Sequence, residues 1–365
     1  MTYNLEAQKR IRAGFIGAGG HGYRNVYPTF QYAAVDLVAL ADHHPDKAAG
    51  YARLFGAERW YTDHRDLLTK EKLDAVFISV GFDPQGYPCY PELAIEAMRA
   101  GCHVWIEKPP AATTAEIEVM QRVSVETGKY VAVGYKKMFF PAYEKVKEII
   151  SSPSFGKPAS VFMRYPLSMP ARETRGHQRA WSGFMDLCHP GSALHYLLGP
   201  VTEVVYQRAE KGGVAAVLRF HQGTVGLLHL SAGQGATSPL ERLEIIGEDA
   251  NVVVDNCVHL TYYRRGGSRG SGGYGRAVSY IGPDDTAPLL WEPEFSLGQL
   301  YNKGLFMEGY VQQIDYFTNC VLASEPPIRG GLEDAWHVTR LFEALRYGEE
   351  GAIIRPSDLQ PPPRT

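Results

Sequence analysis

The feature that most constrains this chain is a glycine-rich turn that directly follows its first apolar run. The stretch GFIGAGGHG places Gly17, Gly19 and Gly22 in the pattern G-x-G-x-x-G. In a strand-turn-helix unit the first glycine permits a tight turn, the second lets a pyrophosphate approach the backbone, and the third lets helix and strand pack closely. The start of the helix then offers unpaired N–H groups to phosphates. The pattern predicts a dinucleotide-binding unit near the start of the chain.

Short apolar runs alternate with helical patterns over the first third of the chain. The runs predict strands at 12–16, 35–41, 73–80, 103–107 and 130–134, and the patterns between them predict helices at 45–55, 91–101 and 114–128. The second and third helical patterns end in glycine, a common helix terminus. Such alternation is typical of a parallel sheet covered on both faces. We therefore predict an α/β fold with a Rossmann domain, a doubly wound parallel sheet, over residues 1–134.

The pattern changes to successive strands in the remainder, residues 135–365, which we expect to form a second α/β domain. After a predicted helix at 142–150, strands are expected at 159–165, 202–209, 214–220, 224–232, 242–247, 251–255 and 259–263. Polar or glycine-containing turns join most of them, which favours a mainly antiparallel sheet. Helical blocks are expected at 181–198 and 309–346, the second broken at 324–331. The glycine- and serine-rich stretch 266–276 predicts a flexible surface loop.

Composition excludes several classes of protein. The 365 residues carry a net charge of −3, which gives no support to a nucleic-acid or membrane surface. We find no apolar run long enough to span a membrane and no secretory signal. The five cysteines show no C-x-x-C spacing and are expected to be free thiols. Since the histidines form no H-E-x-x-H or Cys/His cluster, we predict no metal site, and we expect a cytoplasmic protein.

Asp42 ends the second predicted strand, 20 residues after Gly22. A carboxylate at this place accepts hydrogen bonds from a ribose diol and repels a 2′-phosphate, and no arginine follows it directly. We therefore predict NAD rather than NADP as the cofactor. The alternative is that Asp42 only caps the helix that follows. Further cofactor-binding residues are predicted in the same turn and at another strand end: Gly20, His21, Ser79 and Val80.

The stretch HVWIEKPPA places an acid and a base, Glu107 and Lys108, where an apolar strand stops. In a doubly wound sheet, ligands bind beyond the carboxyl ends of the strands, so this pair is predicted to reach the cofactor. The two prolines that follow fix the backbone and cannot extend a strand ladder. A partly buried lysine with a lowered pKa can exchange protons near neutral pH. The alternative is an exposed ion pair of little energetic value.

The tripeptide Glu107-Lys108-Pro109 and the segments around it resemble the glucose-fructose oxidoreductase and inositol dehydrogenase family, Gfo/Idh/MocA. The resemblance extends over nearly the whole chain and includes VGYKKMFFPAY, FMDLCHPGSALHYLLGPVTEV and RLEIIGEDANVVVDN. It implies a Rossmann domain followed by a substrate-binding and oligomerisation domain with a large open, mostly antiparallel sheet. The outer face of that sheet commonly makes the interface of a homodimer or homotetramer. The C-terminal helices are expected to pack back on the first domain.

The resemblance also implies catalytic roles for Lys108, Asp186 and His189. A lysine at the Lys108 position contacts the reacting hydroxyl, and a D-x-G-x-H segment supplies the proton acceptor and an acid that places the substrate. Here the segment reads Asp186-Leu187-Cys188-His189, which matches at His189. Asp186 stands one residue closer than in that pattern, and the glycine is missing. GYKKMFF and the loop at 81–90 also depart from the family pattern, which is explained either by a specialised pocket or by neutral drift.

The segment 164–181, which joins a predicted strand to the helix of His189, is rich in arginines and aromatic residues. Arginines hold carboxylates or phosphates in bidentate geometry, and aromatic rings stack on sugars. This favours a sugar or glycoside substrate, including one that bears an acid group. The alternative is a solvated or interface loop. The predicted substrate residues are Tyr135, Lys136, Arg164, Tyr165, Arg175, Arg179 and Trp181.

These features predict an NAD-dependent oxidoreductase that oxidises a secondary hydroxyl of a sugar, glycoside or cyclitol. Lys108 as an ammonium would stabilise the developing alkoxide, and His189 would take the proton. A second enzyme class with the same residues is a redox-neutral NAD-dependent glycosidase, which oxidises C3 transiently, eliminates the aglycone and returns the hydride. A third possible function is not enzymatic: the protein would bind NAD as a sensor or as an assembly protein.

Overall fold

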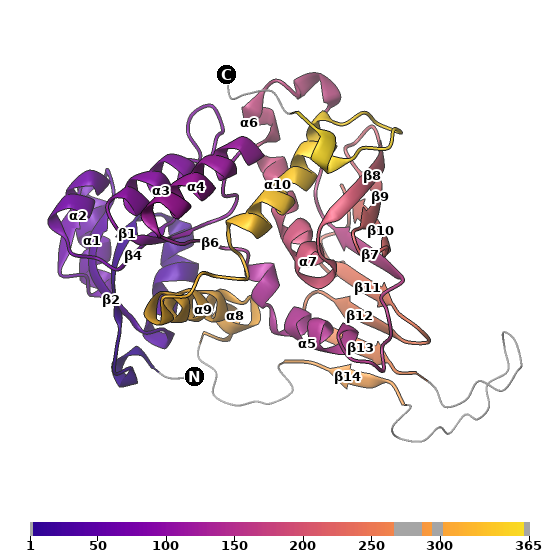
Figure 1. The fold of residues 1–365 in the computed structure, drawn as a ribbon, viewed down its shortest axis with the longest axis horizontal. Coiled ribbons are helices and arrows are strands. Elements are labelled where there is room, and N and C mark those ends of the chain that lie inside the picture. The colour runs from indigo at the N-terminus through magenta and orange to yellow at the C-terminus, as the bar shows by residue number, and fades with distance from the viewer. Residues whose placement is uncertain (1–2, 266–286, 294–301, 361–365) are drawn as a thin grey trace, which may run out of the picture.

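The structure is a computed structural model that describes residues 3–265, 287–293 and 302–360. Two sheets organise the chain, one of six strands from its first third and one of eight strands from the remainder (Figure 1). The segment 266–276, predicted to be a flexible loop, lies outside the described residues.

The six-stranded sheet is parallel throughout, in the order β3-β2-β1-β4-β5-β6. Its strands are β1 (Ile11–Ile16), β2 (Val35–Ala41), β3 (Arg59–Tyr61), β4 (Ala75–Ile78), β5 (His103–Ile106) and β6 (Val131–Val133). The order reverses between β1 and β4, as in a Rossmann fold, which confirms the predicted class. Strand β3 was not predicted because its residues are largely exposed and form no apolar run.

Four helices connect these strands: α1 (Pro45–Phe55), α2 (His64–Lys70), α3 (Tyr90–Arg99) and α4 (Thr114–Thr127). Thr113 begins α4 with a capping box, in which its hydroxyl accepts from the Glu116 N–H and the Glu116 carboxylate accepts from the Thr113 N–H. Gly128, with φ of 68°, ends the helix. The local sequence therefore accounts for both ends of α4.

The segment after the glycine turn is not a regular α-helix. A π-helical turn at Gly22–Val26 leads into a 3-10 helix at Tyr27–Tyr32. Pro28 lies in this segment and has no N–H to donate, which disfavours a continuous α-helical ladder. The Tyr27 hydroxyl instead donates to the Gly17 carbonyl at 2.9 Å, which ties the segment back to the turn.

The eight-stranded sheet has the order β14-β13-β12-β11-β7-β10-β9-β8, and all neighbours are antiparallel except β7 and β10. Its strands are β7 (Ser160–Tyr165), β8 (Val201–Arg208), β9 (Val214–Phe220), β10 (Val225–Leu230), β11 (Arg242–Ile246), β12 (Asn251–Asp255), β13 (His259–Tyr263) and β14 (Leu289–Trp291). Buried and exposed residues alternate along β9 and β10. One face therefore packs on the core and the other is open, as expected for a mostly antiparallel sheet.

Helices cover the inner face of this sheet and lie between it and the first sheet (Figure 1). Helix α10 contacts both α7 and β8 on one side and α4 and β6 on the other, and α9 packs on β1. Glu343 of α10 accepts from the Thr114 N–H at 2.8 Å, which joins α10 to the start of α4. The helices of this half are α5 (Pro141–Ile150), α6 (Gln178–Trp181), α7 (Cys188–Leu198), α8 (Lys303–Met307), α9 (Tyr310–Ala323) and α10 (Leu332–Tyr347).

The helical block predicted at 181–198 is divided. Helix α6 ends at Trp181, a 3-10 helix spans Gly183–Leu187, and α7 begins at Cys188. This break matters for function because Asp186 lies in the 3-10 helix and His189 in the first turn of α7.

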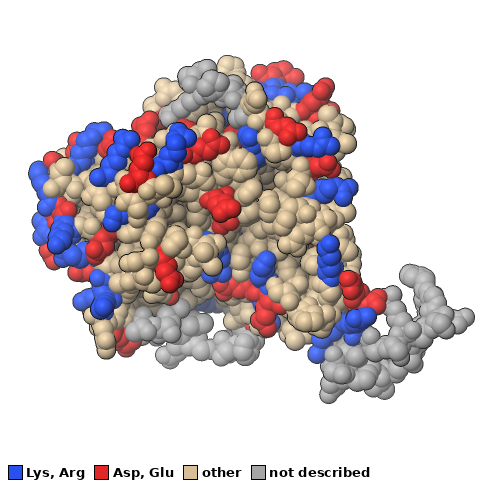
Figure 2. Space-filling model, in the orientation of Figure 1, with Lys and Arg blue, Asp and Glu red and all other residues tan. Residues whose placement is uncertain are grey.

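Within the described ranges, no helix combines the length and apolarity needed to cross a membrane. On the face shown in Figure 2, basic and acidic side chains are interspersed over the helices that surround the first sheet. This face therefore carries no extended surface of one charge.

Candidate active site

A cavity of about 600 Å³ opens beside the glycine turn, beyond the carboxyl ends of β1, β2 and β4. It contains seven of the predicted cofactor residues: Gly17, Gly19, Gly20, His21, Asp42, Ser79 and Val80. We call it the glycine-turn cavity. Its position at the reversal of strand order is where α/β sheets bind nucleotides.

Each of the three glycines in the motif is needed for a different structural reason. Gly17 has φ of 114°, and a Cβ there would lie 2.1 Å from the Ser79 carbonyl oxygen. A Cβ on Gly19 would meet nothing within 4 Å, so the backbone there is open to a ligand. Gly22 packs against Tyr27 and Phe15 instead of lining the cavity. This division fits a turn shaped for a pyrophosphate.

Asp42 is held by two backbone donors on opposite oxygens. Its Oδ2 accepts from the Ala18 N–H at 2.7 Å, and its Oδ1 accepts from the His44 N–H at 2.9 Å. Helix α1 has His44 as its N-cap, so Asp42 is not the N-cap residue considered as the alternative. Each carboxylate oxygen keeps a further lone pair for a ribose hydroxyl.

Glu107 links the glycine turn to the lysine that follows it. This buried carboxylate lies 2.9 Å from His21 Nε2 and accepts from the Lys108 N–H at 3.0 Å. Asn25 contacts the other ring nitrogen of His21 at 3.2 Å. Glu107 does not line the glycine-turn cavity itself. Glu107 instead holds the His21 side chain, and His21 lines the cavity.

Lys108 forms an ion pair with Asp186, 78 residues away in sequence, with Nζ 2.9 Å from Oδ1. Burial alone would lower the pKa of Lys108, but the acidic groups nearby, Cys188, Asp186 and Glu107, outweigh burial and raise it. Burial raises the pKa of Cys188 to about 12, so that thiol is neutral near pH 7. The Asp186 carboxylate is therefore the direct contact that keeps Lys108 an ammonium, and the expected lowering of the Lys108 pKa is corrected.

His189 is almost completely buried, and its ring has no hydrogen-bond partner among the described residues. Burial first, and then the charges of Lys108, Lys137 and other cations, hold its pKa well below the usual range. The nearest aromatic neighbour is Tyr165, with ring centroids 6.0 Å apart. Its imidazole is thus neutral and free to accept a proton. Asp186, predicted to orient either His189 or the substrate, pairs with Lys108.

A second cavity, of about 410 Å³, contains His189. We call it the lysine cavity because Lys136 and Lys137 line it together with Tyr165 and Phe140. Lys136 pairs with Glu308 at its rim and lies over the Tyr310 ring at 4.8 Å. Two predicted substrate residues, Lys136 and Tyr165, therefore meet the predicted base in one space.

The other predicted substrate residues do not reach the lysine cavity. Trp181 is a core residue that packs on Phe184 and Phe342, and Tyr135 is also buried in a core cluster. Their aromatic side chains supply buried area, which the sequence pattern did not separate from sugar stacking.

Three arginines of segment 164–181, Arg164, Arg175 and Arg179, bind backbone carbonyls instead of lining the cavity. Arg164 donates to the Pro239 carbonyl in a groove on the open side of the sheet. Arg175 donates to the Gly348 carbonyl at 2.7 Å, and Arg179 to the Pro84 carbonyl at 2.8 Å. The expectation that Arg164, Arg175 and Arg179 clamp an acidic substrate is corrected, because none of the three lines the lysine cavity and each guanidinium group is bound to a backbone carbonyl.

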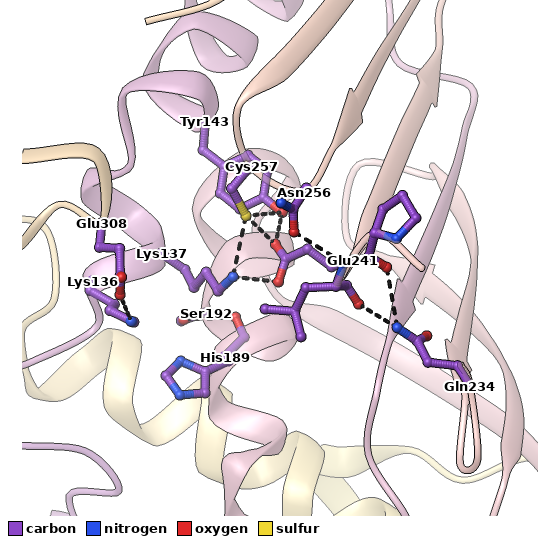
Figure 3. A network of polar contacts seen from close by, with 12 residues as sticks. Lys136, Lys137, Tyr143, His189, Ser192, Gln234, Glu241, Asn256, Cys257 and Glu308 are labelled. Carbon is purple, nitrogen blue, oxygen red and sulfur yellow. Dashed lines mark hydrogen bonds and ion pairs between the residues drawn. The ribbon is translucent and has the colours of Figure 1, made fainter. Parts of the chain in front are cut away.

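The sequence did not point to a buried charged cluster beside the lysine cavity. Lys137, Tyr143, Glu241 and Cys257 form it (Figure 3). In the sequence, only Lys137 drew attention, because it lies in GYKKMFFPAY, a segment in which the family often carries an arginine. Nothing in the sequence indicated that Glu241, which precedes a strand, would be buried beside it.

Among the described residues, no group of three or more His, Cys, Asp or Glu side chains is arranged to hold a metal ion. The fit to NAD rests on the open backbone at Gly19, the acceptor lone pairs of Asp42 and the position of the glycine-turn cavity.

Two family descriptions match the chain in succession. "Oxidoreductase family, NAD-binding Rossmann fold" matches residues 11–135, and "oxidoreductase family, C-terminal alpha/beta domain" matches residues 147–347. A myo-inositol 2-dehydrogenase of Thermotoga maritima is 24% identical over 265 residues, which cover 69% of this chain and 77% of that protein.

Solved structures share the fold over nearly the whole chain. An oxidoreductase of Agrobacterium radiobacter in complex with NAD+, L-tartaric acid and magnesium has a TM-score of 0.74 at 15% identity, covering 96% of this chain and 99% of that one. The WlbA dehydrogenase of Bordetella pertussis, in complex with NADH and UDP-GlcNAcA, has a TM-score of 0.68 at 21% identity, covering 95% and 99%. The chain therefore belongs to the Gfo/Idh/MocA family of oxidoreductases, and its first domain is an NAD-binding Rossmann fold.

Proposed function

We propose that this protein is a dehydrogenase that oxidises a secondary hydroxyl of a sugar, glycoside or cyclitol and transfers the hydride to NAD. One observation carries the proposal. Lys108, which is paired with Asp186, directly follows Glu107, and Glu107 contacts His21 of the glycine-turn cavity. On the other side, His189 lines the lysine cavity. Lys108 and Asp186 line neither cavity, but Lys108 leads the charges that lower the pKa of His189, so a cation and a neutral base lie close together beside a space of substrate size.

The protonation states suit oxidation of an alcohol. Lys108, held as an ammonium by Asp186, stabilises negative charge that develops on the hydroxyl oxygen. His189, held neutral, accepts the hydroxyl proton at a ring nitrogen. NAD held at the glycine turn and Asp42 would supply the hydride acceptor, whereas the protein supplies position and electrostatics. Lys108 therefore acts as a fixed charge, and His189 is the group that moves a proton.

The substrate class follows from the lysine cavity and the relatives. Lys136, Tyr165 and His189 present polar groups beside the Phe140 ring, which suits a polyhydroxylated ring with an apolar face. A related protein is a myo-inositol 2-dehydrogenase, and a similar structure was solved with UDP-GlcNAcA. Because Lys136 and Lys137 already have carboxylate partners, a neutral sugar or cyclitol is the first expectation and an acidic sugar the second.

We also propose that the open face of the eight-stranded sheet pairs with a second copy of the chain. Apolar side chains are exposed along several of its strands, at Val217, Val225, Leu227 and Leu290. Val217 and Leu227 are directly paired between β9 and β10, and an exposed apolar patch of this kind is typical of an interface. Light scattering coupled to size exclusion would show a dimer or tetramer, and a monomer at all concentrations would refute this assembly.

The test of function is a stoichiometry measurement with purified protein. NAD would be added with a panel of inositols, sugars, uronates and aryl glycosides, and NADH absorbance would be followed while products are separated. One NADH per oxidised ring supports the dehydrogenase. Free aglycone without net NADH would replace it with the redox-neutral glycosidase, and NAD binding without any turnover would favour the sensor.

A further inference from the structure

Four side chains that the proposed reaction does not use form a buried cluster beside the lysine cavity (Figure 3). Glu241, just before β11, accepts hydrogen bonds from the Lys137 ammonium and the Tyr143 hydroxyl. The Cys257 thiol donates to the same carboxylate at 2.7 Å. Lys137 has one further hydrogen bond, to Cys257 Sγ at 3.4 Å, and its Nζ lies 4.6 Å from the centroid of the Phe140 ring. A lysine has three N–H groups, so one makes no hydrogen bond within the cluster.

The cluster is consistent only with a charged lysine and a charged glutamate. Burial opposes both charges, but the acidic groups Cys257 and Glu241 raise the pKa of Lys137, and Lys137 lowers that of Glu241. Since the Cys257 thiol stays neutral near pH 7, Glu241 is the negative charge beside Lys137. Burial raises the pKa of Tyr143 and of Cys257, so both stay neutral donors. The Lys137–Glu241 pair is therefore an ion pair, with the positive charge on Lys137 and the negative charge on Glu241.

This ion pair places its positive end toward His189. Lys137 lines the lysine cavity with His189, whereas Glu241 lies behind it and does not. The Tyr165 ring borders both groups, with its centroid 5.7 Å from Lys137 Nζ and 6.0 Å from the His189 ring. Since Asp186 pairs with Lys108, His189 has no carboxylate of its own to hold a proton on its ring.

The charged and titratable groups around His189 differ in how strongly water screens them. In the Lys108–Asp186 and Lys136–Glu308 pairs, the carboxylates are 49% and 51% exposed. In the Lys137–Glu241 pair the side chains are 4% and 1% exposed, so its field is the least screened. The charged and titratable groups around His189 are His21, Glu107, Lys108, Lys136, Lys137, Tyr165, Asp186, Cys188, Cys257, Lys303 and Glu308, with Glu241 behind Lys137.

We propose that Lys137, fixed by Glu241, is a positioning residue whose buried ammonium keeps His189 in the neutral form that accepts the substrate proton. The inference rests on the proposed role of His189 as the base. It adds a determinant of the pH range of the reaction that lies outside the residues expected to touch the hydroxyl.

The test is the titration of His189 followed by NMR in the full-length protein with ¹⁵N-labelled histidine, without substrate or NAD. The His189 signals would be identified by their loss in His189→Asn. We expect the wild-type ring to stay neutral well below the usual titration range of a histidine, and Lys137→Met to raise its titration midpoint by about one pH unit or more. Lys137→Arg keeps the charge and should restore the wild-type titration.

Lys136→Met is the matched control, because it removes a neighbouring ammonium whose partner is exposed, and its shift should be less than half as large. If Lys137→Met does not fold, Lys137→Met/Glu241→Gln removes both buried charges and should still raise the midpoint, by a smaller amount, because Glu241 acts in the opposite direction but lies behind Lys137. An unchanged His189 midpoint in the folded variant, or a shift equal to that of Lys136→Met, would overturn the inference. Because no turnover is needed, failure of the proposed reaction would be seen separately.

Discussion

Replacing Asp42 should selectively weaken the binding of NAD. Its two carboxylate oxygens each accept one backbone N–H, from Ala18 and His44, and each keeps a lone pair that faces the glycine-turn cavity. Asp42→Ala removes the two acceptors available to the ribose hydroxyls. It also leaves the Ala18 N–H without its partner inside the turn.

The size of the effect follows from these contacts. A hydrogen bond to a charged group contributes about 1.5–3 kcal/mol, and water replaces part of it, so losing two should cost about 3 kcal/mol. This corresponds to an NADH dissociation constant about 100-fold higher. NADPH should not weaken in parallel, because the carboxylate that repels a 2′-phosphate is gone. Fluorescence titration of both reduced cofactors measures the change directly.

Two further variants make this prediction specific. Asp42→Asn keeps the shape but offers one acceptor oxygen to two N–H donors, so its NADH affinity should fall between those of wild type and Asp42→Ala. Asp46→Asn alters an exposed carboxylate in the first turn of α1, outside the cavity, and should bind NADH within about twofold of wild type. Wild-type NADH affinity in a folded Asp42→Ala protein would refute the assignment.

Four other variants test the site and its surroundings. Gly17→Ala should lower thermal stability as well as NAD binding, because its Cβ would lie 2.1 Å from the Ser79 carbonyl oxygen, whereas Gly19→Ala should keep the wild-type melting temperature and weaken NAD binding alone. Calorimetry measures the melting temperature of each variant, and titration measures its NAD affinity. Equal melting temperatures for Gly17→Ala and Gly19→Ala would contradict the close approach of Gly17 to Ser79. Asp186→Asn should lower the pKa of Lys108, so the alkaline limb of kcat/KM moves to lower pH because the active form is the ammonium. An unmoved alkaline limb would argue against Lys108 as the required cation. Arg175→Ala should lower the free energy of unfolding by about 1–2 kcal/mol and leave KM unchanged, since its guanidinium bonds to Tyr206 and Gly348. A raised KM at unchanged stability would instead restore Arg175 as a substrate residue.

Much of the fold could be predicted because local pattern and tertiary structure agree. The helix predicted at 45–55 is α1, and the apolar run at 35–41 is β2. The exceptions are elements without an apolar pattern, such as the exposed strand β3, and the π and 3-10 turns at Gly22–Tyr32, where Pro28 interrupts regular donors. Such features depend on neighbours that the local sequence does not specify.

The site was predictable where a motif has a fixed place on the sheet. Gly17, Gly19 and Asp42 line the glycine-turn cavity because they follow strand ends that meet at one edge. The partner of Asp186 was not predictable, since the choice between Lys108 and His189 depends on how a 3-10 helix approaches β5. Trp181 and Arg175 show the same limit, because an aromatic or an arginine in a loop looks alike whether it packs inward or binds a ligand.

The most direct test of the central claim is NADH formation by wild type and Lys108→Met on the best substrate of the panel, with NADH affinity measured in parallel. We expect the turnover number to fall about 1,000-fold or more in the variant, because it loses the cation that stabilises the alkoxide, while NADH affinity changes by less than about threefold. A variant that forms NADH at the wild-type rate would contradict the assignment of Lys108 to the reaction centre.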